Sequence, residues 1–251
     1  MCESPRRDQN NPMPPGLNLI SSNRVETLLG LLAEEIAARP PTSPFSTETV
    51  VVPSPAMARW VNLNLAQENG IAANIHYPLP ATWIWEIARG LLEGLPEIDP
   101  LSRETAAWKI FFLLPRLLDR QEFIAIKRYL HADPDGIKRW QLSMKIAGVF
   151  DRYQFYRPDW ISDWCAGKDC VWQALLWREL IETIQSLHRI EVIDAVLASL
   201  NQPASNQRLP ERVSLFAISS LAPLFVDVIH HLARHTRVLL FLHSPSEHYW
   251  A

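Results

Sequence analysis

The sequence predicts an α/β protein whose parallel sheet is interrupted by a large, all-helical insertion. Strand and helix patterns alternate over residues 17–80, only helical patterns follow over residues 81–200, and the alternation returns over residues 201–251. Alternating strands and helices are typical of parallel sheets with crossover helices. Residues 1–16 are polar and rich in proline, so we expect them to form a disordered extension.

Three strands and two helices are expected in the first α/β part. β-Branched and apolar runs predict buried strands at Leu17–Ser21, Thr49–Val52 and Ile71–Ile75. Ser22 and Asn23 stand where side chains cap the first helix, and Pro40 ends it. The second helix follows Pro53-Ser54-Pro55, and Gly70 stands where a helix-terminating glycine belongs.

Helical spacing of apolar residues predicts seven segments in the insertion. These are residues 81–92, 102–114, 122–130, 137–156, 158–164, 171–187 and 190–200. Pro115 and the turn at residues 133–136 are expected to break the run. In the closing α/β part, strands are expected at 213–218 and 238–242, on either side of a helix at 224–234.

Composition excludes several classes of protein. A hydrophobic fraction of 48% and a net charge of −3 argue against disorder and against a wholly basic nucleic-acid-binding protein of the histone type. Three cysteines suit a reducing compartment, and Cys165 and Cys170 are expected to be free thiols. Because no apolar run is long enough to span a membrane and residues 1–16 lack the apolar segment of a signal peptide, we expect a cytoplasmic protein.

The turn after the first strand lacks the groups that hold a nucleotide. It runs Ser21–Arg24, without the glycines and the Lys-Ser/Thr pair of a phosphate loop. The later strand leads into Phe216–Ser220, which has no carboxylate to hold Mg²⁺. His231 and His235 stand four residues apart but have no third ligand nearby, so they are interpreted as surface histidines. We therefore expect no ATP hydrolysis, no cofactor, no metal and no catalytic residue.

One helical segment is unusually basic. Residues 127–157 hold seven basic and three acidic side chains, a local charge of +4 in an acidic chain. Lys138, Lys145 and Arg152 follow one another at intervals of seven, which places them in one stripe about 21 Å long. Leu142, Ile146, Val149 and Tyr153 are expected to form the opposite, buried stripe. Nearby aromatic rings could stack on bases, namely Trp140, Tyr156, Trp160 and Trp164. The alternative is an ordinary amphipathic surface helix.

Several short strings, in this order, resemble the exodeoxyribonuclease V gamma subunit (RecC) family. They are Ser22-Asn23-Arg24, Ala58-Arg59-Trp60, Gly70–Ile75, Pro78–Ala81, Trp85, Phe150–Tyr153, Tyr156–Trp160 and Ile218–Pro223. The resemblance covers about residues 17–250. It implies the N-terminal part of a helicase-like fold of the P-loop NTPase type that has lost its ATPase function, which agrees with the empty phosphate turn.

The resemblance also implies a function and partners. Members of the family join a RecB-like and a RecD-like subunit at double-strand DNA ends, guide single strands and recognise the Chi signal during recombinational repair of DNA damage. Carried over by position, the DNA-binding candidates of this chain are Pro53, Pro55, Arg59, Leu79, Trp85, Asp151, Arg152, Arg157 and Arg189. Lys138 and Lys145 are added from the basic stripe.

The chain departs from the family at the strand-guiding surface. Pro53 and Pro55 replace hydrogen-bonding side chains, and Arg59 replaces a neutral amide. Because proline has no side-chain donor or acceptor, specific reading of a base sequence is in doubt. Two alternatives therefore stay open: an active helicase or nuclease subunit, and a protein-docking scaffold without DNA contact.

Overall fold

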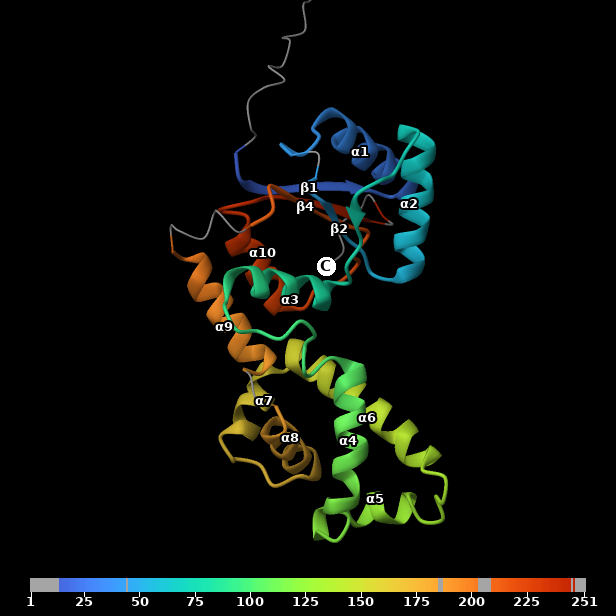
Figure 1. The fold of residues 1–251 in the computed structure, drawn as a ribbon, viewed down its shortest axis with the longest axis vertical. Coiled ribbons are helices and arrows are strands. Elements are labelled where there is room, and N and C mark those ends of the chain that lie inside the picture. Colours follow the sequence, from blue (N-terminus) through green and yellow to red (C-terminus); the bar gives the residue numbers. More distant parts are fainter. Residues whose placement is uncertain (1–13, 44, 185–186, 203–208, 245, 247–251) are drawn as a thin grey trace, which may run out of the picture. The chain divides into compact units, whose positions relative to one another are not determined.

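The structure is a computed structural model that describes residues 14–43, 45–184, 187–202, 209–244 and 246. Its strands are β1 (Gly16–Ser22), β2 (Glu48–Val51), β3 (Ile75–His76), β4 (Arg212–Phe216) and β5 (Arg237–His243). Its helices are α1 (Val25–Ala38), α2 (Pro55–Asn69), α3 (Pro80–Leu91), α4 (Arg103–Leu117), α5 (Ile124–Tyr129), α6 (Ile137–Tyr156), α7 (Pro158–Cys165), α8 (Trp172–Glu182), α9 (Arg189–Leu200) and α10 (Pro223–Leu232) (Figure 1). A 3₁₀ turn, Gln121–Phe123, precedes α5. Most of the expected N-terminal extension, residues 1–13, lies outside the described residues.

The chain divides into two compact units. We call the first the sheet unit; it holds the strands and consists of the described residues up to Trp83, between 209 and Ser220, and from Ile229 onward. The second, the helical unit, consists of residues 84–202 and 221–228. The predicted α/β class with a parallel sheet is confirmed. The first half of α10 groups with the helical unit, which differs from the expected boundary at residue 200.

The sheet has five parallel strands in the order β1-β5-β4-β2-β3. Aligned residues such as Val50, Ser214 and Leu239 face one side, and the next set, including Val51 and Leu215, faces the other. The central strands are buried on both faces, as parallel sheets usually are. α1 and α2 lie together on one face, where a core cluster joins them to β2, β4 and β5 (Figure 1).

Two strand predictions need correction. β1 is an edge strand that pairs only with β5, so Leu17 and Leu19 are 50% and 61% exposed rather than buried. The third strand is only Ile75–His76, whereas residues 71–74 are irregular and Asn74 has a positive φ of 55°. Both differences arise from pairing with other strands, which local composition does not encode.

The helix ends follow the sequence in part. Ser54 caps α2, since its Oγ accepts a hydrogen bond from the Met57 N–H at 3.2 Å, and Gly70 ends it with a left-handed φ of 76°. At α1 the capping prediction is wrong, because Arg24 is the N-cap residue and Ser22 Oγ accepts from the Arg24 N–H instead. The predicted break at Pro115 is also wrong. α4 continues to Leu117, because Leu114 and Leu117 are buried and hold the last turn.

The helical unit has its own core. Side chains from α4, α6, α7 and α8 form one buried cluster around Ile110, Phe150 and Trp177. The ring of Phe150 meets that of Trp177 edge to face, with 5.3 Å between the ring centroids. α8 ends at Glu182, earlier than predicted, and residues 185–186 lie outside the described part. None of the helices in the described part of the chain is long and apolar enough to cross a membrane.

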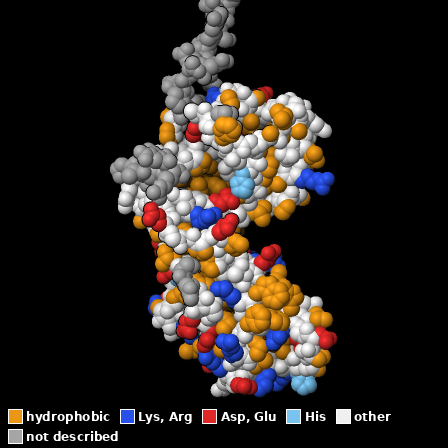
Figure 2. Space-filling view, in the orientation of Figure 1, with side chains coloured by type: hydrophobic (Ala, Val, Ile, Leu, Met, Phe, Trp, Pro, Cys, Tyr) orange, Lys and Arg blue, Asp and Glu red, His pale blue; other side chains and the backbone are white. Residues whose placement is uncertain are grey.

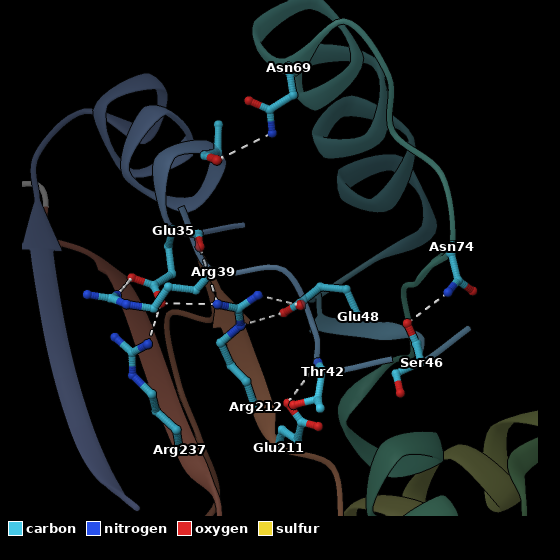
Figure 3. Close-up of polar contacts among 11 residues, drawn as sticks. Glu35, Arg39, Thr42, Ser46, Glu48, Asn69, Asn74, Glu211, Arg212 and Arg237 are labelled. Carbon is cyan, nitrogen blue, oxygen red and sulfur yellow. Dashed lines mark hydrogen bonds and ion pairs between the residues drawn. The ribbon is translucent and has the colours of Figure 1, made fainter. Parts of the chain in front are cut away.

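An ionic network joins the amino ends of the strands in the sheet unit (Figure 3). Glu35 of α1 accepts hydrogen bonds from Arg39, Arg212 and Arg237. Arg212 also donates from Nε to Glu48 at 2.9 Å. Burial alone would raise the pKa of the Glu35 carboxyl, but the hydrogen bonds from Arg39 and Arg237 outweigh burial and hold that pKa below 4.5. We refer to these five residues as the sheet network.

Candidate nucleic-acid surface

The basic stripe predicted for the helical unit lies on α6, and its side chains are exposed. Asp133 anchors the start of the helix, because its carboxylate accepts hydrogen bonds from the backbone N–H groups of Lys138 and Arg139 at 3.0 and 2.9 Å. Lys138, Lys145 and Arg152 all point to solvent. Within the described chain, the side chains of Lys145 and Arg152 have no partner, so their charges are available to a ligand.

The buried face of α6 differs from the expected one. Of the four predicted residues only Ile146 is buried, while Leu142, Val149 and Tyr153 are half-exposed. The buried side chains are Ser143, Ile146, Ala147, Phe150, Gln154 and Phe155. The buried arc is shifted because α4 packs on one flank of α6 and α7 on another. The basic stripe lies opposite the buried side chains that the structure shows.

At the end of α6, Arg157 is held by its own neighbours. Its Nε and Nη2 donate to the two carboxylate oxygens of Asp159 at 3.1 and 2.9 Å, and its guanidinium lies 3.6 Å from the ring centroid of Trp160. The hydrogen bond to Asp159 raises the pKa of Arg157, so it stays charged. Trp160 is 38% exposed and Tyr156 is 54% exposed. The side chains of Tyr156, Arg157 and Trp160 therefore reach the surface together.

Arg189 and Asp151 are brought together in the interior of the helical unit. Arg189 is 4% exposed; it donates from Nη1 to Asp151 at 2.6 Å and from Nε to Asp99 at 2.9 Å. Its guanidinium also lies 4.6 Å from the ring centroid of Phe155. Burial would lower the pKa of Arg189, but the charges of Asp99 and Asp151 raise it. These contacts give Arg189 a structural role, and a DNA strand could reach little of its side chain. We call Arg189, Asp99 and Asp151 the arginine triad.

The remaining predicted residues follow the carboxyl ends of two neighbouring strands in the sheet unit. The Val52 N–H donates to the Pro78 carbonyl at 3.1 Å, which ties together the segments that leave β2 and β3. Pro53, Pro55, Arg59 and Leu79 are all exposed beside this link. We call them the strand-end surface. Ligands of open parallel sheets commonly bind at this edge.

Two of the predicted aromatic faces are buried. Trp85 is 4% exposed, and its indole N–H donates to the Pro96 carbonyl at 3.1 Å. Trp164 is 3% exposed and packs edge to face on Phe150. Neither ring offers a face for base stacking in this conformation, because both are buried, and Trp164 belongs to the core cluster of the helical unit. Trp140 stays partly exposed.

The carbonyl groups of the turn after β1 contact the end of β5 and the residue that follows it. The Ser22 carbonyl accepts from the Ser244 N–H at 2.9 Å, and the Asn23 carbonyl lies 3.2 Å from His243 Nε2. A phosphate loop binds its ligand through free backbone N–H groups, whereas the Arg24 N–H of this turn donates to Ser22 Oγ at 3.1 Å. No group of three His, Cys, Asp or Glu side chains suited to a metal ion occurs among the described residues.

A thiol–imidazole–carboxylate arrangement was not foreseen from the sequence. Cys165 Sγ lies 3.9 Å from His188 Nε2, and His188 lies 3.6 Å from the Glu191 carboxylate. Burial raises the pKa of the Cys165 thiol and lowers that of His188. The pair therefore lacks the thiolate–imidazolium charge separation of activated cysteine nucleophiles. Cys165 and His188 are 23 residues apart in the sequence and belong to no local motif, so no sequence pattern indicated this arrangement.

Together these features define a class of protein. It is a parallel α/β protein whose helical unit has its own core, whose first turn is hydrogen-bonded to the segment after β5, and which carries an exposed basic helix. The chain belongs to the RecC N-terminal domain family, whose family model matches residues 17–251. The resemblance noted in the sequence is thereby confirmed.

Relatives in several bacteria carry the same domain. The chain is 34% identical over 247 residues to the RecBCD enzyme subunit RecC of Escherichia coli, a match that covers 93% of this chain and 22% of that protein. It is 30% identical over 261 residues to the RecBCD enzyme subunit RecC of Haemophilus influenzae, covering 91% and 23%. The corresponding protein of Mycolicibacterium smegmatis is 29% identical over 231 residues, covering 88% and 21%. The chain spans about a fifth of the length of these relatives.

Proposed function

We propose that this chain is the N-terminal part of a RecC-like subunit that guides single-stranded DNA within a RecBCD-type helicase–nuclease, or exodeoxyribonuclease V. The observation that carries the proposal is the exposed stripe of Lys138, Lys145 and Arg152 in a chain of this family. We further propose a cytoplasmic protein that acts with RecB-like and RecD-like subunits on duplex ends during recombinational repair.

The stripe supports strand guidance by charge and length. Three cations spread along about 21 Å of helix can meet several phosphates of one strand. Such contacts fix position without reading sequence. Arg157, already oriented by Asp159 and Trp160, would extend the path past the end of α6.

The strand-end surface is the proposed second contact. Arg59 would supply a charge and Leu79 an apolar surface next to Pro53 and Pro55. Because prolines offer no side-chain hydrogen bond, recognition of a Chi-like sequence would depend on other residues. The arginine triad and Trp85 are buried within the helical unit, and we propose that they hold that unit in shape.

Catalysis is assigned to the partners in this proposal. The helicase-like fold would be an inactive one, because the turn Ser21–Arg24 and the end of β4 lack the lysine and carboxylate of ATP hydrolysis. ATP-dependent unwinding by the isolated full-length subunit would contradict this assignment and favour an active helicase.

A salt titration tests the strand-guiding role. Anisotropy of a fluorescein-labelled oligothymidylate is measured against the chain and against the triple variant K138A/K145A/R152A. Each lost phosphate contact lowers the slope of log K against log salt by about 0.7, so the triple variant is expected to lose about 2 units of slope. The control R89A/R116A/K168A removes the same charge from exposed positions off the stripe. Equal slopes for the two triple variants would overturn the proposal.

A further inference from the structure

A second exposed feature of the helical unit lies between α4 and α6, away from the basic stripe. Trp108, Phe111 and Phe112 of α4 cluster with Trp140 of α6, and we call these four side chains the aromatic patch. The ring centroids of Trp108 and Trp140 are 4.2 Å apart. Trp108 is 53% exposed and Phe112 is 65% exposed. Apolar side chains gather over α4 and α6 in the space-filling view (Figure 2).

The core of the helical unit does not account for Trp108 and Phe112 of this patch, whereas Trp140 packs partly against that core. The buried residues of α4, such as Ala107, Ile110 and Leu114, lie on its other side and pack in the main cluster. Clustered large rings facing solvent are uncommon in monomeric proteins and mark interaction sites. Tryptophan in particular is enriched among the side chains that dominate protein interfaces.

A pocket adjoins the patch at the start of α6. Its volume is about 320 Å³, and it is lined by Pro115, Leu118, Leu130, Asp133, Pro134, Asp135, Gly136 and Arg139. Phe111 connects the two features, because the Arg139 guanidinium lies 3.9 Å from the centroid of its ring. We call this the acidic pocket.

The polar groups of the pocket differ in what they still offer. Arg139 is committed to the Phe111 ring, and its buried Nε has no hydrogen-bond partner in the described part of the chain. Asp133 already accepts two backbone N–H groups of α6. Asp135 is exposed and, among the described residues, takes part in no hydrogen bond or ion pair. Its carboxylate is the charge that a ligand would meet.

We infer that the aromatic patch and the acidic pocket together dock a segment of a second polypeptide that carries a lysine or arginine beside large apolar side chains. The methylene stem would lie on the proline and leucine walls, its cationic end would reach Asp135, and the apolar side chains would cover Trp108 and Phe112. DNA is disfavoured, because two carboxylates would repel phosphates and the rings already stack partly on one another.

This surface is distinct from the proposed strand path. Trp140 and Lys138 are two residues apart on α6, so they point about 200° apart around the helix. One helix would therefore carry a strand on one side and a protein on the other. The docking inference stands even if the basic stripe binds no DNA.

Selection of peptides tests the inference without a known partner. Phage displaying random 12-residue peptides are selected on the immobilised chain, after depletion on the variant W108S/F112S. We expect the enriched peptides to combine Lys or Arg with Trp, Phe, Leu or Ile within four residues. Selection on D135K, an exposed substitution that leaves the patch intact, should enrich Asp or Glu instead. Enrichment of acidic peptides on the unaltered chain, or no enrichment beyond the depleted pool, would overturn the inference.

Affinity measurements then separate the possible ligands. Fluorescence polarisation of the most enriched peptide should weaken at least tenfold for W108S/F112S and for D135K. The control I98S/I124S changes two exposed apolar residues outside the patch and should leave affinity unchanged. Oligothymidylate affinity should be the same for the unaltered chain, W108S/F112S and I98S/I124S. Weaker oligothymidylate binding by W108S/F112S would assign the patch to DNA and overturn the docking assignment.

Discussion

Both units bury arginine, but they do so in different ways. The sheet network spreads three arginines and two glutamates over α1, β2, β4 and β5, and Glu35 alone has three cationic partners. The arginine triad relies on one cation, Arg189, for the carboxylates of Asp99 and Asp151. Buried charges are costly without a partner, so the number of alternative partners decides how much one substitution can damage. The sheet unit should tolerate the loss of one arginine better than the helical unit.

The largest effect is expected from Arg189→Ala. The substitution leaves Asp99, which is 8% exposed, without its cation, and removing one partner of a buried pair typically costs about 3–5 kcal/mol. Urea unfolding followed by tryptophan fluorescence would measure the free energy of unfolding. Arg152→Ala is the control, because it removes an exposed, unpaired arginine from the same unit. Similar losses for the two variants would contradict the account of the triad.

A smaller effect is expected from Arg212→Ala in the sheet network. Glu48 is 6% exposed and loses the arginine that contacts it, while Glu35 keeps Arg39 and Arg237. Breaking a buried ion pair typically costs about 3–5 kcal/mol, and we expect the lower end of this range because only Glu48 loses its cation, whereas Asp99 and Asp151 both lose theirs in the arginine triad.

Arg237→Ala is the matched comparison within the same network. Glu35 then keeps two cationic partners and Glu48 keeps Arg212, so urea unfolding should give a smaller loss than for Arg212→Ala. The reverse order would mean that the network is not redundant in the way its contacts suggest.

The sequence predicted those helix bounds that depend on residues close together in the chain. The segment predicted as residues 137–156 is α6, Ile137–Tyr156, because a long amphipathic period and the turn at Gly136 fix both its length and its start. Gly70 and Ser54 likewise mark the ends of α2 through their own backbone and side-chain chemistry. The exposure of β1 was not predictable in this way, since it depends on which strand the edge pairs with.

Candidate sites that one helix carries could likewise be predicted, whereas sites that join residues far apart in the sequence could not. The basic stripe could be predicted, because one helix carries all of it. The arginine triad could not, because Arg189 meets partners 90 and 38 residues away in the sequence. Trp164 was expected to offer a face for base stacking, yet packing decided its burial.

The smallest effect is expected from acid, and it belongs to the sheet network. The pKa of Glu35 lies below 4.5 in the folded protein, because the hydrogen bonds from Arg39 and Arg237 outweigh its burial. A carboxyl with a lowered pKa stabilises the fold above its unfolded pKa, and this contribution disappears as the pH falls through the folded pKa. A loss of stability is therefore expected as acid protonates Glu35.

Urea unfolding of the chain and of Glu35→Gln, compared between pH 7 and pH 3, would isolate this contribution. The variant should be less stable at pH 7, and the difference from the unaltered chain should shrink as the pH falls through the folded pKa of Glu35, because the carboxyl then becomes neutral like the amide. Glu104→Gln, an exposed carboxylate outside the network, should show no such convergence. Arg189 stays protonated throughout, since its pKa is raised by Asp99 and Asp151 despite burial. A difference between the chain and Glu35→Gln that is independent of pH would mean that Glu35 acts through packing and not through its charge.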